Sequence, residues 1–356
     1  MISYVVMAGG RGERFWPRSR SSLPKQFLSI KDNNSLMQST VEKLKKIALP
    51  QQIYIITDIE YRDIVYKQVP ELPRENILLE PCGKDTAAAI GYAAISIYKQ
   101  NPHSIMVVLP ADHAIEGEHE YLRTITLASH IAALQDVIVT IGIKPTRPET
   151  GYGYIECGDC CHNGIAYQVS TFREKPDIDM AKKYVEAGNF LWNSGIFVWK
   201  VDFILREIEK FLPNHYEGLS ELINCVGESE EALRLKLENI YQKLNKISID
   251  YGVLEKSTST VVVPANFTWD DVGSWLAMDR MLDKDNNNNA VFGPSMIVDT
   301  TDCIIYSAGP LVATAGINNM VVVVTEDAVL VCTKEKSTDL KYLVGKIKGS
   351  NFQHVL

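Results

Sequence analysis

The chain opens with a short apolar run that breaks into a glycine-rich loop. The run Ser3–Met7 is apolar enough to form a buried strand, and three of the four residues 9–12 are glycine. Glycine has no Cβ, so such a loop can approach a ligand closely, and its backbone N–H groups can surround phosphate oxygens. Arg14 and Lys25 follow and can add positive charge. The segment therefore predicts a strand followed by a phosphate-binding loop.

This loop differs from two common phosphate-binding motifs. The chain has no G-x-x-x-x-G-K-[ST], and the dinucleotide fingerprint G-x-G-x-x-G would need glycine at Glu13 or Phe15. A dehydrogenase is therefore the weakest interpretation. Taken alone, the loop is explained equally well as an ordinary strand-to-helix turn with solvated arginines.

Composition excludes several classes of protein. A net charge of −8 argues against a nucleic-acid surface, and no apolar run approaches the roughly 20 residues that span a bilayer. The N-terminus lacks the features of a signal peptide. Seven cysteines, an odd number in a chain of 356 residues, are typical of reduced thiols. We therefore expect a cytoplasmic protein with neither nucleic-acid nor membrane partners.

One group of cysteines resembles part of a zinc site. Cys157, Cys160, Cys161 and His162 lie close together, but no second, separated pair accompanies them. Ligands crowded this closely would strain a tetrahedral site. We expect a polar hairpin tip instead.

Apolar runs alternate with helical patterns through the first 145 residues. Strands are expected at Ile53–Thr57, Ile77–Leu79 and Ile105–Leu109, and Asp85 would cap a helix over Thr86–Tyr98. This alternation predicts an α/β fold, a doubly wound sheet that is mixed but mostly parallel, with helices on both faces.

Ligands bind such sheets at the carboxyl ends of the strands. The glycine loop, Glu80 and Asp112 each follow an expected strand directly. We therefore expect these three elements to contribute to one site.

The polar run 285–289 is the clearest boundary in the chain. It separates a predicted catalytic domain, residues 1–284, from a predicted β unit with a terminal helix, residues 290–356. Five short strands are too few to bury both of their faces alone, so we expect them to pack on the rest of the chain or on a second subunit.

Further motifs follow the glycine loop in a characteristic order. They are Leu79-Glu80-Pro81, Asp85–Ala89, Pro110–His113, Gly151–Ile155, Phe172–Pro176, Trp192–Gly195, Ile249–Tyr251 and Trp269–Gly273. With Met7–Phe15, they make the chain resemble the sugar-phosphate nucleotidyltransferases, and within them the mannose-1-phosphate guanylyltransferase branch. Lys84-Asp85-Thr86-Ala87-Ala88-Ala89 departs from the family's frequent Arg-Asn-Thr-Ala-Pro-Ala.

The resemblance implies a Rossmann-like nucleotidyltransferase core and a C-terminal unit built as a short left-handed β-helix that makes homodimer contacts. It also implies a reaction: GTP and α-D-mannose 1-phosphate give GDP-mannose and pyrophosphate, with Mg²⁺ as cofactor. Two alternatives stay open. The sugar 1-phosphate could be another one, such as a heptose, or the chain could be a non-catalytic sugar-nucleotide sensor.

The resemblance and the residue chemistry together assign roles to the site residues. The catalytic set is Arg14, Lys25, Asp112 and Asp271, of which Asp112 and Asp271 would bind the metal. The nucleotide set is Ala8, Gly9, Gly10, Gly12, Arg14, Lys25, Glu80, Pro81, Thr86 and Asp112. The sugar-phosphate set is Gly153, Glu174, Lys175, Asn193 and Gly195.

Structural roles compete with several of these assignments. Asp112 could cap a helix, Lys175 could lie in a solvated turn, and the segment 193–195 could form a bulge. Trp192 and Trp269 are expected to be packing residues. Asp270 and Asp271 could both cap a helix that begins near residue 273.

Overall fold

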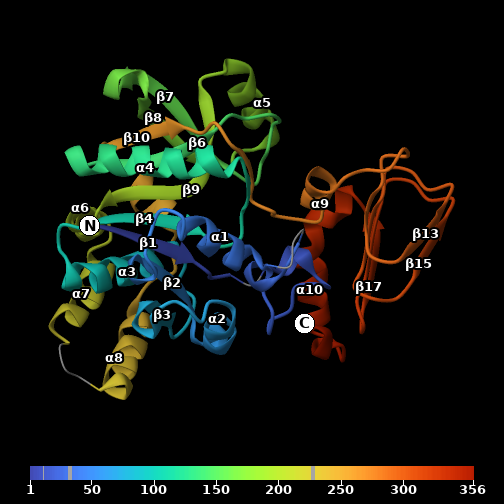
Figure 1. The fold of residues 1–356 in the computed structure, drawn as a ribbon, viewed down its shortest axis with the longest axis horizontal. Coiled ribbons are helices and arrows are strands. Elements are labelled where there is room, and N and C mark those ends of the chain that lie inside the picture. The colour runs from blue at the N-terminus through green and yellow to red at the C-terminus, as the bar shows by residue number, and fades with distance from the viewer. Residues whose placement is uncertain (11, 31–33, 226–228) are drawn as a thin grey trace. The chain divides into compact units, whose positions relative to one another are not determined.

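The computed structural model describes residues 1–10, 12–30, 34–225 and 229–356 (Figure 1). The chain forms two compact units. The first unit comprises Met1–Gly9, Thr40–Ala111 and Ile115–Trp269, and the second comprises Gly10–Ser39, Asp112–Ala114 and Asp270–Leu356. The second unit therefore contains the predicted C-terminal β unit together with Gly10 and Gly12 of the glycine loop and the segment that follows them.

The described residues of the first unit form a nine-stranded sheet in the order β3-β2-β1-β4-β9-β6-β10-β8-β7. Strands β8 and β9 run antiparallel to their neighbours, whereas the β1–β2, β2–β3, β1–β4 and β6–β10 pairs are parallel. The predicted mixed sheet is confirmed. Its strands are β1 (Ile2–Met7), β2 (Ile53–Asp58), β3 (Ile77–Glu80), β4 (Ile105–Pro110), β6 (Ile138–Ile143), β7 (Gly153–Cys161), β8 (Ala166–Glu174), β9 (Phe190–Lys200) and β10 (Thr260–Pro264).

Helices cover both faces of this sheet, as the continuous apolar strands predict. Figure 1 shows α4 on one side and α3, α7 and α8 on the other. Val5 and Met106 belong to the buried cluster that also holds the alanines of α3. The predicted cap is present, because Asp85 accepts a hydrogen bond from the Thr86 N–H at 2.8 Å. The helices up to α8 are α1 (Leu36–Leu44), α2 (Arg62–Gln68), α3 (Thr86–Gln100), α4 (Glu118–Leu134), α5 (Ile178–Ala187), α6 (Val201–Phe211), α7 (Pro213–Ser220) and α8 (Glu230–Lys243).

The C-terminal part of the second unit is a parallel β coil. Its chain alternates between a four-stranded sheet, β12-β14-β16-β17, and a two-stranded sheet, β13-β15. All pairs are parallel except β16–β17, so the predicted β-helix-like unit is confirmed. Its elements are β12 (Ala290–Phe292), β13 (Ser295–Val298), β14 (Ile304–Ser307), β15 (Val312–Ala315), β16 (Met320–Val324), β17 (Val329–Thr333) and α10 (Leu340–Lys348).

The core of the second unit joins this coil to the segment after the glycine loop. Phe15 and Trp275 lie with ring centroids 5.1 Å apart, and Trp275 and Tyr306 lie 5.5 Å apart. The indole N–H of Trp275 donates to the Trp16 carbonyl at 3.0 Å, and that of Trp16 donates to the Val355 carbonyl at 2.8 Å. The coil therefore packs on residues of its own chain.

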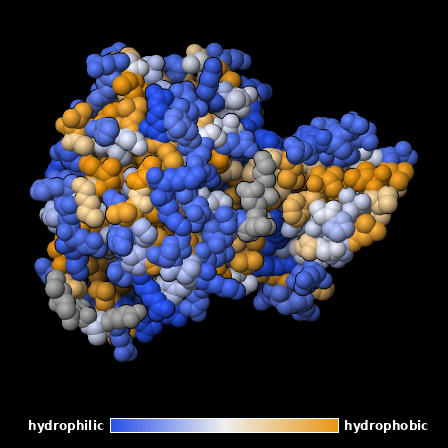
Figure 2. Space-filling view, viewed as in Figure 1, coloured by the Kyte–Doolittle hydropathy of each residue, from blue (hydrophilic) through white to orange (hydrophobic). Residues whose placement is uncertain are grey.

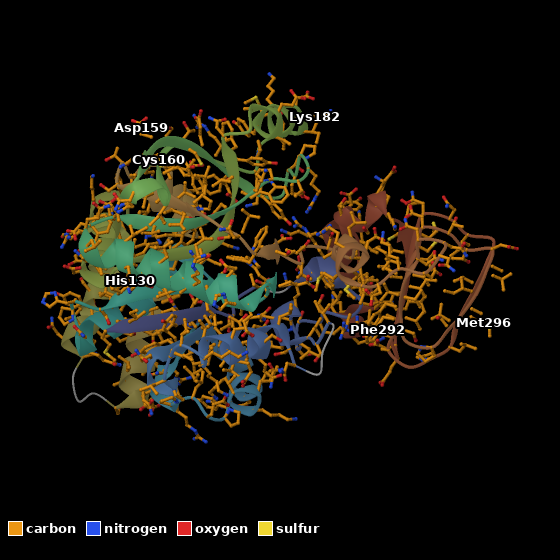
Figure 3. The ribbon with its side chains drawn as sticks, turned by 45° about the horizontal axis from the view of Figure 1, so that its top comes forward. His130, Asp159, Cys160, Lys182, Phe292 and Met296 are labelled. Atoms are coloured by element: carbon orange, nitrogen blue, oxygen red, sulfur yellow. The ribbon has the colours of Figure 1, made fainter. Side chains whose placement is uncertain are left out.

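The cysteine-rich segment forms a hairpin tip between β7 and β8, as expected. Asp159 and Cys160 lie at the outer end of this hairpin (Figure 3). Among the described residues, no group of three or more His, Cys, Asp or Glu is placed to hold a metal ion. All seven cysteines are free thiols. None of the helices in the described ranges combines the length and apolar character needed to cross a bilayer.

Two fully buried tryptophans allow a matched stability test. Trp275 donates a hydrogen bond, whereas the Trp199 indole N–H has no partner among the residues that the structure describes. We expect Trp275→Phe to lower the free energy of unfolding by about 1–3 kcal/mol more than Trp199→Phe, because it leaves the Trp16 carbonyl unsatisfied. Urea unfolding followed by circular dichroism measures both losses. Equal losses of unfolding free energy in the two variants would show that the Trp275 hydrogen bond does not contribute to stability.

Candidate active site

The glycine loop has a backbone shape that requires glycine at two positions. Gly10 and Gly12 have φ of 96° and 60°, which side chains disfavour. A Cβ on Gly12 would lie 2.6 Å from Lys25 Cβ and 2.9 Å from its backbone nitrogen. Ser19 Oγ donates to the Gly12 carbonyl at 2.7 Å, and Gln26 Nε2 donates to the Gly10 carbonyl at 3.1 Å. The loop is therefore packed directly on the segment that carries Lys25.

Lys25 is buried, with 6% of its surface exposed, and three acceptors surround its ammonium. Nζ lies 2.6 Å from Asp112 Oδ2 and donates to the carbonyls of Asp271 and Val272 at 2.6 and 3.1 Å. An ammonium has three donors, so this arrangement satisfies all of them. Lys25 thus joins the Asp112 carboxylate to the backbone at Asp271.

Asp112 remains ionised in this setting. Burial alone would raise the pKa of the Asp112 carboxyl, but its interactions with Lys25 and His113 outweigh burial and hold the pKa below its usual range. Burial lowers the pKa of His113. Asp112 does not cap a helix, because strand β5 (Ala114–Glu116) follows it and pairs with β11 (Thr268–Asp270).

Asp270 and Asp271 differ in their partners. Asp270 accepts from the Val272 N–H at 2.8 Å and pairs with Arg280 at 2.5 Å. Asp271 Oδ1 accepts from the Gly273 N–H at 3.0 Å. These bonds form turns that precede helix α9 (Leu276–Met281), so neither carboxylate caps that helix.

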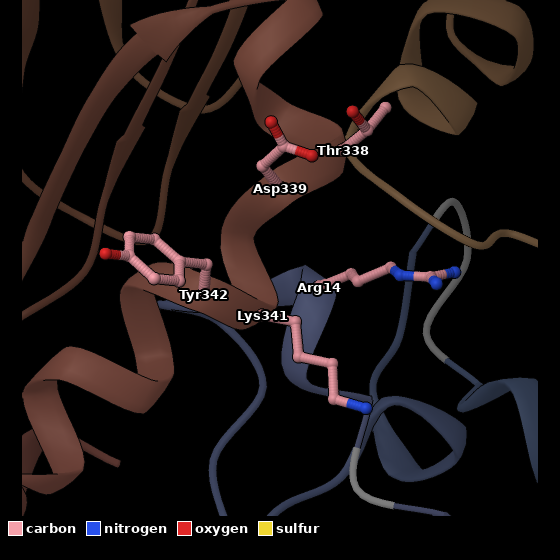
Figure 4. Close-up of a pocket in the computed structure, with 5 residues that line it drawn as sticks. All are labelled: Arg14, Thr338, Asp339, Lys341 and Tyr342. Carbon is pink, nitrogen blue, oxygen red and sulfur yellow. The ribbon is translucent and has the colours of Figure 1, made fainter.

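Arg14 lies at a hollow on the second unit. It is exposed, and the hollow is lined by Arg14, Thr338, Asp339, Lys341 and Tyr342 (Figure 4). Sequence reasoning assigned no role to the four residues of the terminal helical segment. They carry no local motif and lie far from the glycine loop in the chain.

In the first unit, Glu80 ends β3 as a buried carboxyl. Tyr241 donates to Glu80 Oε1 at 3.1 Å. Burial raises the pKa of Glu80 to about 8, although the Tyr241 hydrogen bond acts in the opposite direction. Pro81 follows at a bend directly after the strand.

The segment that departs from the family pattern holds another motif in place. Lys84 Nζ donates to the Leu244 carbonyl at 2.9 Å, and Thr86 Oγ1 accepts from the Ile249 N–H at 2.8 Å. The residues after α8 are therefore anchored on the start of α3. This anchoring fixes the position of Asp250.

Asp250 lies with the predicted sugar residues of the first unit. Asn193 Nδ2 donates to its Oδ1 at 2.9 Å, and burial together with the Glu174 charge raises the pKa of Asp250 to about 7. Glu174 pairs with Lys175 through Oε1, whereas its buried Oε2 has no partner among the described residues. A Cβ on Gly153 would lie 2.3 Å from that oxygen. Sequence reasoning did not assign Asp250, although it lies in the Ile249–Tyr251 match.

The segment 193–195 is a bulge in β9. The β6–β9 register shifts there, and Gly195 has φ of 70°. Ser194 Oγ donates to the Ile141 carbonyl at 2.7 Å, and Gly195 N–H donates to Asn193 Oδ1 at 3.1 Å. A bulge re-aims a side chain, so this structural role is compatible with a binding role for Asn193.

The two tryptophans are packing residues, as expected. Tyr152 contacts both edge-on, with ring centroids 5.1 Å from Trp192 and 5.0 Å from Trp269. Arg147 lies over the Trp192 ring at 5.1 Å.

The predicted residues divide between the units. The second unit brings together a phosphate-loop and carboxylate group consisting of Gly10, Gly12, Arg14, Lys25, Asp112 and Asp271. The first unit holds Ala8, Gly9, Glu80, Pro81, Thr86 and the whole sugar-phosphate set. Ala8 is buried, and its carbonyl accepts from Thr57 Oγ1 at 2.8 Å.

Comparison with known proteins identifies the family of the chain. The sequence model of the nucleotidyl transferase family matches residues 3–288. The chain belongs to that family. A second model, that of the mannose-phosphate isomerase/GMP-like beta-helix domain, matches residues 293–347. The family and the coil were both expected from the motifs.

Individual relatives match over nearly the whole chain. A putative mannose-1-phosphate guanylyltransferase of Vibrio cholerae is 36% identical, over 99% of this chain and 75% of its own length. An Escherichia coli mannose-1-phosphate guanylyltransferase is 37% identical, over 98% of this chain and 74% of its own length. The crystal structure titled mannose-1-phosphate geranyltransferase from Thermus thermophilus is 34% identical, with a TM-score of 0.88 over 98% of this chain and 99% of that one.

Gly12 and Gly9 provide a matched pair of loop variants. A Cβ on Gly9 would meet no heavy atom within 4 Å. We expect Gly12→Ala to lower both thermal stability and turnover, the latter by at least about 10-fold, because a left-handed alanine costs about 1–2 kcal/mol and the Cβ displaces Lys25. Gly9→Ala should keep the wild-type unfolding temperature. Wild-type stability in Gly12→Ala would show that the loop tolerates the added Cβ.

The raised pKa of Glu80 predicts a pH dependence of stability. Its pKa is about 8 in the folded chain and 4.5 in the unfolded reference, so the folded state holds the proton between these values. Stability should fall as pH rises through this window, by up to about 1.4 kcal/mol per pH unit. Glu80→Gln removes this contribution, so the variant should gain relative to wild type between pH 5 and 8 in urea unfolding. A constant difference would refute the raised pKa.

Proposed function

We propose that the chain transfers a guanylyl group from GTP to α-D-mannose 1-phosphate and releases GDP-mannose and pyrophosphate. The observation that carries the proposal is the Lys25 cluster behind the glycine loop, in a chain more than a third identical to mannose-1-phosphate guanylyltransferases over nearly its whole length. Family membership supplies the reaction class, nucleotidyl transfer.

The residues of the second unit suit this chemistry. A phosphate oxygen of the sugar 1-phosphate is already ionised and needs no general base, so catalysis depends on positioning and on neutralising charge. Arg14 is exposed and available for the triphosphate. Lys25 lies against Asp112 at 2.6 Å and keeps that carboxylate ionised and oriented. In-line attack on the α-phosphorus would take place beside these groups.

Mg²⁺ suits the oxygen chemistry of Asp112 and Asp271. Both carboxylates are hard oxygen ligands, and Lys25 connects the Asp112 carboxylate to the backbone carbonyl of Asp271. Mg²⁺ favours one or two carboxylates completed by water and substrate phosphates, so a pair suffices. When bound, the ion would neutralise charge on the α-phosphate. Asp270, paired with Arg280, would orient the turn instead.

The first unit would recognise the base and the sugar. The Glu80 carboxyl could accept from guanine N1–H or N2–H through its oxygen that carries no proton, with Pro81 and Thr86 beside it. Glu174 Oε2 has no partner among the described residues, which suits an oxygen that accepts from a hexose hydroxyl. Gly153, Asn193 and Gly195 would complete the hexose contacts, and Lys175 would meet the sugar phosphate.

We further propose a homodimer that works in the cytoplasm. The second unit exposes apolar side chains on β13 and β17, and β17 is an edge strand of its sheet (Figure 2). Exposed apolar strands of this kind are typical of subunit contacts. The free thiols suit a reducing compartment.

A pyrophosphate-release assay tests the reaction. The wild-type chain should be most active with GTP and mannose 1-phosphate in a matrix of four nucleoside triphosphates and several sugar 1-phosphates, a heptose phosphate among them. A clear preference for another sugar would replace the substrate, and release with none of the pairs would support a non-catalytic sensor.

Paired aspartate variants test the metal assignment. Asn keeps the turn-forming oxygen of either aspartate but removes the charge. We expect Asp271→Asn to lower Mg²⁺-dependent kcat by at least about 10²-fold, as for a lost transition-state contact, and Asp270→Asn to keep measurable turnover. Steady-state kinetics at several Mg²⁺ concentrations measure both. The reverse order of effects would assign the metal to Asp270.

A further inference from the structure

The hollow beside Arg14 has no role in the assignments above. It measures about 480 Å³ and lies between the segment after the glycine loop and the start of α10. This volume falls within the range of small-molecule sites. Lys341 contributes the second cation of its lining, and Asp339 contributes the one carboxylate.

Both cations are available to a ligand. Arg14 and Lys341 are exposed, and within the described part of the chain neither forms an ion pair. In Figure 4 their charged ends point to the same side of the hollow, whereas the Tyr342 ring points the opposite way. Asp339 has a cationic partner of its own, since Lys336 Nζ lies 3.4 Å from its Oδ2.

Several contacts fix Lys341 beside Arg14. Lys348 of α10 pairs with Glu13 at 2.6 Å, next to Arg14 in the chain. Leu340 and Val344 are buried in the same cluster as Phe15. Helix α10 is therefore held against the segment that carries Arg14. Lys341 and Arg14 stay close together although they lie at opposite ends of the sequence.

We propose that Lys341 is a second phosphate-binding cation, which holds the terminal phosphates of the triphosphate together with Arg14 and then the pyrophosphate product. The inference rests on the proposed function. Two neighbouring cations without partners repel each other, and a polyanion relieves that repulsion. Arg suits a bidentate contact and Lys a point charge, which together fit a diphosphate. The C-terminal unit would then contribute a residue to the substrate site.

Charge variants on one helix test the proposal. We expect Lys341→Gln to raise both KM for GTP and Ki for pyrophosphate by about 10-fold, the size of a lost charge-assisted contact, with KM for mannose 1-phosphate unchanged. Lys341→Arg should restore both constants. Asp339→Asn should tighten pyrophosphate inhibition. The matched control is Lys346→Gln, on the same helix but over the outer Tyr342 ring at 5.2 Å, which should leave both constants unchanged.

Calorimetric titration with Mg²⁺ and inorganic pyrophosphate separates this proposal from the proposed function. It measures binding even if no sugar nucleotide is made. Weaker binding to Lys341→Gln than to Lys346→Gln, with wild-type circular dichroism, supports the role of Lys341. Equal affinities of the two variants, or no pyrophosphate binding to the wild-type chain, would overturn it.

Discussion

The geometry of the second unit depends on the buried ammonium of Lys25. It connects the Asp112 carboxylate, which follows β4, to two backbone carbonyls at Asp271 and Val272, which follow β11. A buried charge is costly unless it is paired and hydrogen-bonded, and here every donor of the ammonium has an acceptor. Gly12 is required because any Cβ would enter the space of Lys25. The glycine loop, the Lys25 ammonium, the Asp112 carboxylate and the backbone at Asp271 therefore form one connected group.

The C-terminal residues stabilise this group through hydrogen bonds to the segment that follows the glycine loop. Trp16 and Arg20 both donate to the Val355 carbonyl, at 2.8 and 2.6 Å, and the Ser21 N–H donates to the Leu356 carbonyl at 2.9 Å. These bonds hold the segment that leads from the glycine loop to Lys25. The β coil is thus more than an appended module, because its core is shared with residues 10–39. Any role it has in assembly would be additional to this one.

Sequence alone predicted the elements whose signals are local. The apolar strands and the Asp85 cap of α3 follow from periodicity and capping chemistry. Five strands were expected after residue 289, whereas the described residues form six, because the three residues of β12 directly follow a polar run and give no period. The partners of Lys25 and the environment of Lys341 depend on contacts between distant segments, which no local pattern contains.

Burial has opposite electrostatic consequences in the two units. Burial raises the pKa of Glu80 to about 8, and burial together with the Glu174 charge raises that of the partly buried Asp250 to about 7. Asp112 is held below its usual pKa because Lys25 supplies the compensating charge. At neutral pH the carboxyls of the first unit can therefore carry a proton, which suits selective hydrogen bonding to a base or a hexose. The carboxylate of the second unit stays charged, which suits a metal ion. Carboxyl side chains thus suit ligand recognition in the first unit and metal binding in the second. The difference arises because Lys25 lies beside the carboxylate of the second unit.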